Sequence, residues 1–172
     1  TAISAWIKDQ PGGTPNTFSL STNTGLLVTN LTDPGQWASS LKSYQPDLLT
    51  TKSGTTSLSQ SLDLATDKLP KPDMKRVIIY ITTLPLASQV NALKDLTERA
   101  TTLDVRIFVW FIGSTANTQS DEGKTLQQMA DRSGGKLFLL TGPETFPDIR
   151  DYLQPLSKRY QISYVSGIMT SG

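Results

Sequence analysis

The chain has 172 residues, of which 37% are hydrophobic, and this length suits one globular domain better than two. Its 16 basic and 15 acidic residues give a net charge of +1, which argues against a nucleic-acid binder that depends on bulk electrostatics. Cysteine and histidine are both absent, so the sequence excludes thiol nucleophiles, disulfides, imidazole bases and a Ser-His-Asp triad.

The first part of the sequence predicts a helix followed by a β-hairpin. Residues 1–10 carry apolar side chains at helical spacing, which places Trp6 and Ile7 on one face. Two extended runs, 17–22 and 26–31, flank a turn that contains glycine, and this arrangement is typical of a hairpin.

Two further helices are predicted after the hairpin. Asp33 can cap the first amide groups of one helix, and Pro34 suits its first turn because that position needs no amide donor. Residues 52–56 are interpreted as a loop. The helix after this loop places Leu58 and Leu62 on one apolar stripe.

Two continuous apolar runs predict strands that are buried on both faces, as in a parallel sheet covered by helices. The first run is 77–81 and the second is 105–112. Between them, residues 90–103 carry apolar side chains at helical spacing and predict a helix. The polar segment 113–123 is interpreted as a loop.

The remainder of the sequence predicts a helix, a short strand and a last helix. Gly134 and Gly135 predict a left-handed cap at the end of the first of these helices, and the strand is expected at 136–140. Phe146 begins the apolar face of the last helix. Residues 160–165 alternate in polarity and are interpreted as a final strand.

Strands and helices therefore alternate, which predicts an α/β fold with three α/β/α layers and a Rossmann-like, mostly parallel sheet. Residues 1–166 are expected to form a single domain, and residues 167–172 a loose tail. No uninterrupted apolar stretch has the length that a membrane-spanning helix needs, so we expect no membrane span in this chain.

Six segments occur in an order and at intervals that match a known family. They are 17–20, 31–34, 53–58, 76–83, 105–113 and 126–138. Together they resemble a von Willebrand factor type A domain from its second strand onward, over about residues 1–155. The resemblance implies a sheet that is mostly parallel, with one antiparallel edge strand.

The resemblance also implies that one strand of the family is missing from this sequence. The family opens with a central strand that ends in Asp-x-Ser-x-Ser, and nothing here matches it. The domain is therefore expected to be N-terminally incomplete. Each backbone group left buried and unpaired would cost about 1–3 kcal/mol, so we expect an upstream segment, another chain or a rearranged pairing to replace the strand.

In the family, a divalent-cation site lies at the carboxyl ends of the strands. Thr56 matches a threonine that the family uses to hold Mg²⁺, whereas Thr83 stands where the family has an aspartate. A neutral hydroxyl is a poor replacement for a carboxylate, so we predict a degenerate site that binds no metal. Helix capping is the other interpretation of Thr55 or Thr56. The alternative is a metal-dependent adhesion site, in which upstream residues and Thr56 hold Mg²⁺.

Two pairs of carboxylates could support acid–base chemistry, but both have a structural interpretation. Asp121 and Glu122 open a predicted helix, where the helix dipole favours acidic side chains. Asp148 and Asp151 lie at i, i+3 on the exposed face of the last predicted helix. We therefore predict that the chain is not an enzyme, and the alternative is an enzyme of Rossmann-like type.

We expect a protein-interaction or adhesion-type module within a larger polypeptide, and a structural spacer is a further alternative. Ligands of open α/β sheets bind at the carboxyl ends of the strands. In this sequence that edge collects Thr55, Thr56, Thr83, Leu84 and Ser114. Such a hydroxyl-rich, weakly charged surface suits a protein or peptide better than a phosphate. Serine and threonine make up 41 of the 172 residues, which favours an extracytoplasmic location.

Overall fold

The computed structural model describes residues 2–9, 16–45, 54–66, 75–142, 146–151 and 153. Within them the chain forms two separate β-sheets and a set of helices. The parallel sheet has the order β3-β4-β5, with strands at Arg76–Thr82, Val105–Ile112 and Leu137–Leu140. The other sheet is an antiparallel hairpin of β1 and β2, at Phe18–Thr22 and Gly25–Leu31. The helices are α1 (Ala2–Lys8), α2 (Pro34–Ser43), α3 (Gly54–Thr66), α4 (Val90–Thr102), α5 (Thr115–Gln119) and α6 (Asp121–Arg132), with a 3-10 turn, η1 (Ala87–Gln89), before α4.

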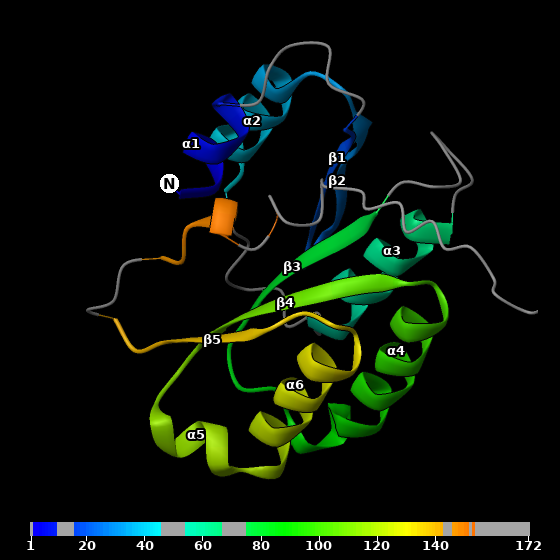
Figure 1. The fold of residues 1–172 in the computed structure, drawn as a ribbon, viewed down its shortest axis with the longest axis vertical. Helices are drawn as coiled ribbons and strands as arrows, with labels where there is room; N and C mark the ends of the chain where they lie inside the picture. Colours follow the sequence, from blue (N-terminus) through cyan, green and yellow to red (C-terminus); the bar gives the residue numbers. More distant parts are fainter. Residues whose placement is uncertain are drawn as a thin grey trace, which may run out of the picture.

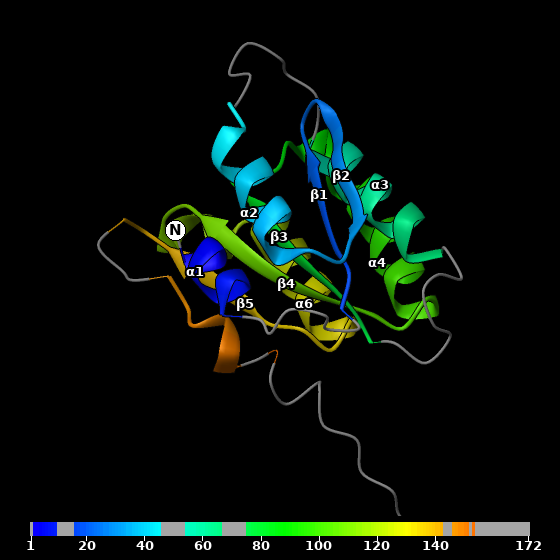
Figure 2. The same cartoon turned by 90° about the horizontal axis from the view of Figure 1, so that it is seen from above.

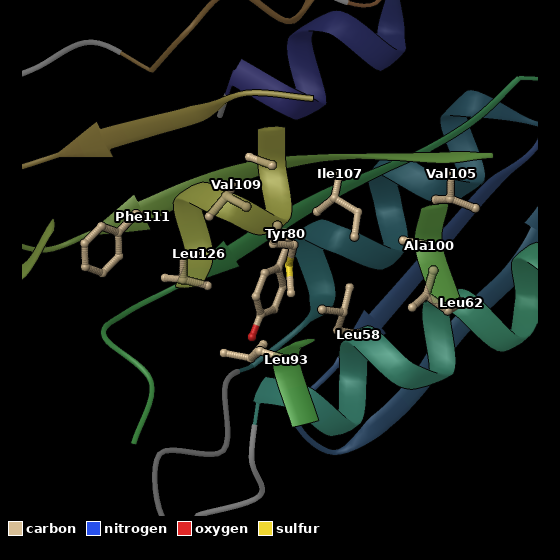
Figure 3. Packing of buried hydrophobic residues seen from close by; sticks show 12 residues of the cluster. Leu58, Leu62, Tyr80, Leu93, Ala100, Val105, Ile107, Val109, Phe111 and Leu126 are labelled. Atoms are coloured by element: carbon tan, nitrogen blue, oxygen red, sulfur yellow. The ribbon is translucent and has the colours of Figure 1, made fainter. Parts of the chain in front are cut away.

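Helices flank the parallel sheet on both faces. Successive residues of β4 point to opposite sides of the sheet, so this strand contributes side chains to a buried cluster on each face. The odd-numbered residues from Val105 to Phe111 join a buried cluster with side chains of α3, α4 and α6 (Figure 3). Trp110 points the other way, into a second cluster that contains Ile149 and is flanked by side chains of α1. The two views of the ribbon show the same layers, with α3, α4 and α6 on one face and α1 on the other (Figures 1 and 2). The predicted mixed α/β fold with a parallel sheet between helices is confirmed.

The hairpin and α2 form where the sequence supplies a turn and a cap. Gly25 has a φ of +135°, which side chains rarely tolerate, and it pairs with Thr22 to close a tight turn. Asp33 caps α2, because its carboxylate accepts hydrogen bonds from the N–H groups of Gly35 at 2.7 Å and Gln36 at 3.3 Å. The predicted hairpin and the predicted capped helix are confirmed.

The end of α6 fixes how this helix packs on β4. The N–H of Gly135 donates to the carbonyl of Ala130 at 2.8 Å, and the N–H of Gly134 donates to that of Asp131 at 3.1 Å. Gly134 has a φ of +75°, so these bonds form a Schellman motif and confirm the predicted left-handed cap. A Cβ built on Gly135 would lie 2.0 Å from the carbonyl oxygen of Ile107, so the helix end and β4 meet backbone to backbone.

The predicted single sheet is wrong for the described residues. β3 pairs in parallel with β4, and no strand ladder in the described ranges joins β3 to the hairpin. The antiparallel strand therefore belongs to a separate two-stranded sheet and is not the edge of the parallel one. β3 is also mostly half-buried, not buried on both faces as predicted, and Ile81 is 47% exposed. Among the described strands, β3 has a partner on one side only, whereas β4 has one on each side.

α3 begins earlier than predicted. It starts at Gly54, inside the predicted loop 52–56, so Thr55 and Thr56 lie in its first turn and do not cap it. The missing side chain at Gly54 lets the helix start pack closely, since a Cβ there would lie 2.8 Å from the Tyr80 hydroxyl. Packing against β3 thus outweighs the low helix propensity of glycine.

The predicted loop 113–123 is also wrong, because it is helical over most of its length. It contains α5 and the first turn of α6, and two serines supply the caps. The Ser114 hydroxyl accepts a hydrogen bond from the N–H of Asn117 at 3.3 Å, and the Ser120 hydroxyl accepts one from the N–H of Gly123 at 3.2 Å.

The C-terminal part is described only up to residue 153. The spacing of apolar residues predicts that Phe146 lies on the last helix. In the structure Phe146 is not helical, and the helical residues begin at Ile149. Ile149 is buried, with 1% of its surface exposed. The predicted strand at 160–165 and the predicted tail at 167–172 lie outside the described residues.

Candidate functional site

The predicted binding residues lie near the carboxyl end of β3 and the start of α3. A Cβ built on Gly54 would lie 3.8 Å from Thr82 Oγ1, so the first turn of α3 meets the end of β3. Thr55 and Thr56 belong to that first turn, and Thr83 directly follows β3. The structure therefore brings these three threonines to one end of the sheet.

The predicted residues differ in how accessible they are. Thr56 and Thr83 are exposed, whereas Thr55 is half-buried. Leu84 is half-buried against the core cluster below. Ser114 follows β4 and is exposed, but its hydroxyl is engaged in the cap of α5. These five residues are called the rim, and the two threonines that are exposed supply its most accessible hydroxyls.

Tyr80 lies buried below the rim, with 6% of its surface exposed. Burial raises the pKa of its phenol above the ordinary value of 10.0, and a hydrogen bond with the Thr82 side chain partly offsets this effect. Thr82 Oγ1 also donates to the carbonyl oxygen of Thr83 at 2.9 Å. Tyr80 is therefore protonated at neutral pH and supports the rim through hydrogen bonding, not as a base.

We expect Tyr80→Phe to reduce the loss of stability in alkaline solution. Because the pKa is raised in the folded state, the unfolded state releases its phenolic proton first as the pH rises past about 10, and the free energy of unfolding then falls. Below that pH the contribution is fully present. Urea unfolding of both proteins between about pH 8 and pH 11 checks this, and an equal alkaline loss in the two would contradict it.

Of the carboxylates considered for acid–base chemistry, Glu122 and Asp148 accept hydrogen bonds at helix starts. Asp121 and Glu122 occupy the first turn of α6. A hydrogen bond to its own backbone N–H lowers the pKa of Glu122, and one to the Ser120 side chain lowers it further. Asp148 Oδ1 accepts from the N–H of Arg150 at 2.9 Å. These contacts agree with a structural interpretation of both pairs.

The donor atoms of the rim do not fit a divalent cation. Thr56 and Thr83 offer neutral hydroxyls, whereas Mg²⁺ selects carboxylate oxygens and water in a near-octahedral set. Across the ranges that the structure describes, no group of three or more histidine, cysteine, aspartate or glutamate side chains is placed to share an ion. The rim therefore offers hydroxyl and apolar groups to a ligand, and no carboxylate.

Three exposed apolar side chains beside the rim were not predicted. Ile81, Ile112 and Phe146 are 47%, 46% and 53% exposed. Ile81 lies opposite Trp110 in the β3–β4 register, and the ring centroids of Phe146 and Trp110 are 5.2 Å apart. Ile112 is two residues beyond Trp110 on β4 and so lies on the same face. The three side chains are called the apolar margin.

No sequence signal separates the apolar margin from its buried neighbours. The runs 77–81 and 105–112 are apolar throughout, and exposure within them depends on which elements cover each residue. Beneath the margin, Trp110 Nε1 is buried and has no hydrogen-bond partner among the described residues. An unsatisfied buried donor is uncommon in folded proteins, which sets this part of the sheet apart from the rest of the core.

No protein-family model matches the chain, and a search of curated proteins finds none that matches it. In the part of the chain that the structure describes, no helix combines the length and apolar character needed to cross a membrane. A functional assignment for this chain therefore rests on the chemistry of the rim and the apolar margin.

Proposed function

We propose that this chain is a non-enzymatic protein-interaction module of the von Willebrand factor type A kind, within a larger extracytoplasmic polypeptide. It binds a protein or peptide at the rim, with the apolar margin as the adjoining contact surface. The observation that carries the proposal is the exposure of Ile81 and Ile112, each two residues before a rim residue (Thr83 and Ser114), with Phe146 packed against Trp110 on the same face of the sheet. Exposed apolar side chains gathered in one place are typical of interaction surfaces.

The chemistry of this surface favours a polypeptide ligand. Hydroxyls next to apolar side chains match the mixed apolar and hydrogen-bonding composition of protein interfaces. A phosphate or nucleic acid would require arginine or lysine side chains, and the rim and the apolar margin contain neither. We therefore propose an adhesion-type contact with a protein or peptide, without a metal ion.

Peptides selected against the immobilised chain from a random phage-displayed library test the proposal. We expect them to bind the rim, so that Thr83→Arg weakens binding by about tenfold or more. Thr102→Arg is the matched control, because Thr102 is also an exposed threonine but ends α4, just before the start of β4 at the other end of the sheet. Equal effects of the two substitutions, or a failure to select any binder, would contradict the proposal.

A thermal melt in divalent cations separates this proposal from metal-dependent adhesion. We expect the Tm of the chain to be the same in Mg²⁺ or Mn²⁺ as in sodium chloride of matched ionic strength, since an ion bound to the folded state would raise it. A Mg²⁺-specific rise in Tm that Thr56→Ala abolishes would instead support the metal-dependent alternative.

A further inference from the structure

One asparagine of this chain lies in the acceptor motif for N-linked glycosylation. Asn30-Leu31-Thr32 has an asparagine, then a residue other than proline, then a threonine. The other four asparagines of the sequence have no serine or threonine two positions later. Because a motif of three residues also occurs by chance, the structure around Asn30 decides whether it suits this modification.

The motif lies at the surface, where the hairpin leads into α2. Asn30 and Leu31 are the last two residues of β2, and Thr32 precedes Asp33, the N-cap of α2. Asn30 and Thr32 are exposed, whereas Leu31 between them is half-buried and pairs with Phe18 of β1. The two residues that glycosylation uses are therefore accessible, and the middle residue anchors the segment to the hairpin.

A β-bulge sets the backbone conformation of Asn30. The register of the hairpin shifts between Phe18 and Leu20, which leaves Thr29 and Asn30 of β2 opposite Ser19 alone. Asn30 has a φ of +50°, a left-handed conformation that asparagine tolerates better than most side chains do. Its backbone N–H donates to Ser19 Oγ at 2.9 Å. The bulge therefore holds the backbone of Asn30 in place without using its side chain.

The side-chain amide of Asn30 differs from those of two other asparagines in its contacts. Asn23 Oδ1 accepts a hydrogen bond from the Tyr44 hydroxyl at 3.0 Å, and Asn117 Oδ1 accepts one from the N–H of Ser114 at 2.9 Å. Within the described part of the chain, no hydrogen-bond partner contacts the side-chain amide of Asn30. Asn23 and Asn117 thus stabilise local structure, whereas the amide of Asn30 is available to a modifying enzyme.

The surroundings of Asn30 leave space for a large hydrophilic group. Ser19 beside it, and Thr29, Thr32 and Asp33 along the chain, are all exposed and polar. An N-linked glycan is bulky and lies in solvent, and at this position it displaces no buried side chain. The hairpin is also a separate sheet from the one that ends at the rim, so this site is distinct from the proposed binding surface.

We propose that Asn30 carries an N-linked oligosaccharide. The proposal rests on the extracytoplasmic location proposed above, because glycosylation of this motif is typical of secreted proteins. The donor is an oligosaccharide linked to a polyprenyl pyrophosphate. A bond forms between Asn30 Nδ2 and the anomeric carbon of the first sugar, and the bond from that carbon to the pyrophosphate oxygen breaks. The pyrophosphate leaves with the electron pair, the amide nitrogen loses one proton, and nothing is oxidised or reduced.

Secretion of the intact 172-residue chain from cultured mammalian cells, behind a cleavable signal sequence, tests the site. We expect intact-mass spectrometry to find most of the secreted chain heavier than its sequence requires, and peptide N-glycosidase to remove the excess mass. Because this enzyme leaves aspartate where the glycan was attached, tandem mass spectrometry then locates aspartate at position 30. The signal sequence supplies the compartment, so the result depends neither on the natural location of the chain nor on binding at the rim.

Two exposed threonines on either side of Asn30 provide matched variants. We expect Thr32→Ala to abolish the excess mass and Thr32→Ser to retain it, because serine also satisfies the motif. Thr29→Ala is the control outside the motif and is expected to leave the excess mass unchanged. Asn30→Asp removes the acceptor nitrogen but keeps a residue that tolerates the left-handed conformation. We expect this variant to be secreted in folded form with no excess mass.

A circular dichroism melt shows whether the described hairpin accommodates the glycan. We expect the glycosylated chain and the Asn30→Asp variant to have the same helix content and to unfold cooperatively. Loss of the cooperative transition in the glycosylated chain alone would overturn the proposal, because it would show that the glycan does not fit this surface.

The mass measurements would overturn the proposal if the secreted wild-type chain had no excess mass, if the excess survived Thr32→Ala, or if Thr29→Ala removed it. None of these results would bear on the rim, which the selected peptides test separately. Glycosylation of Asn30 in a chain for which no peptide is selected would support this site and would count against the rim alone.

Discussion

Alanine at Trp110 or at Phe111 is expected to lower the free energy of unfolding by about 3–5 kcal/mol in each case. The two residues are neighbours on β4 and point to opposite faces, yet they are 1% and 0% exposed. Phe111 belongs to the cluster with α3, α4 and α6, and Trp110 to the cluster flanked by α1. Each substitution removes a large buried side chain and leaves a cavity, so both are severe only if the sheet is covered on both faces.

Urea unfolding monitored by circular dichroism measures both effects, with Ile112→Ala as the control on the same strand. Ile112 is 46% exposed, so its truncation is expected to cost about 1 kcal/mol or less. A small loss for Trp110→Ala together with a large loss for Phe111→Ala would show that only one face of β4 is packed. Such a result would contradict the packing of α1 against the second face of the sheet.

Gly135→Ala is expected to destabilise the chain by about 3 kcal/mol or more, at the top of the usual range for overpacking. A Cβ at this position would lie 2.0 Å from the carbonyl oxygen of Ile107 and 2.6 Å from its carbonyl carbon. Both are backbone atoms of β4, so no side-chain rotation relieves the contact. Either the end of α6 or the strand itself has to move.

Gly134→Ala separates the steric effect from the effect of backbone conformation. Gly134 has a φ of +75°, but a Cβ there has nothing closer than the Arg106 side chain at 3.9 Å. We expect a cost of about 1–2 kcal/mol from the left-handed conformation alone. Thermal and urea unfolding of the two variants provide the comparison. A smaller loss for Gly135→Ala than for Gly134→Ala would show that α6 does not end against β4 as described.

Local signals in the sequence are sufficient to predict most elements of this fold. The apolar run 105–112 coincides with β4, and the Asp33-Pro34 pair marks the start of α2, because each depends on contacts within a few residues. The glycines after α6 predict its left-handed cap for the same reason. The predicted alternation of strands and helices then leads to a parallel sheet between helices.

Features that depend on distant contacts were not predictable in this way. Gly54 lies in the predicted loop 52–56, yet α3 begins at this residue, and the Tyr80 hydroxyl occupies the space that a side chain there would need. The polar segment 113–123 is predicted to be a loop, yet the hydroxyls of Ser114 and Ser120 cap two helices within it. In each case a contact or a cap outweighs the average behaviour of the residue type.

The candidate site likewise has one part that could be predicted from the sequence and one part that could not. The rim was predictable from the rule that ligands of open α/β sheets bind where the strands end, and Thr56 and Thr83 do lie at that end. The apolar margin was not, since Ile81 and Ile112 have the same residue type and setting as their buried neighbours. Their exposure follows from which strands gain partners and which helices reach them, and no local pattern encodes either.

Among the described strands, β3 is an edge strand with one free side, separate from the hairpin. Amide hydrogen exchange of the 172-residue chain, resolved residue by residue by NMR, tests it most directly. The structure predicts slow exchange along the whole of β4 from Ile107 to Phe111, and alternating slow and fast exchange along β3, because every second amide of β3 points to its free side. Slow exchange at every amide of β3 in the chain alone would contradict the claim, because it would require a partner strand that is already in place.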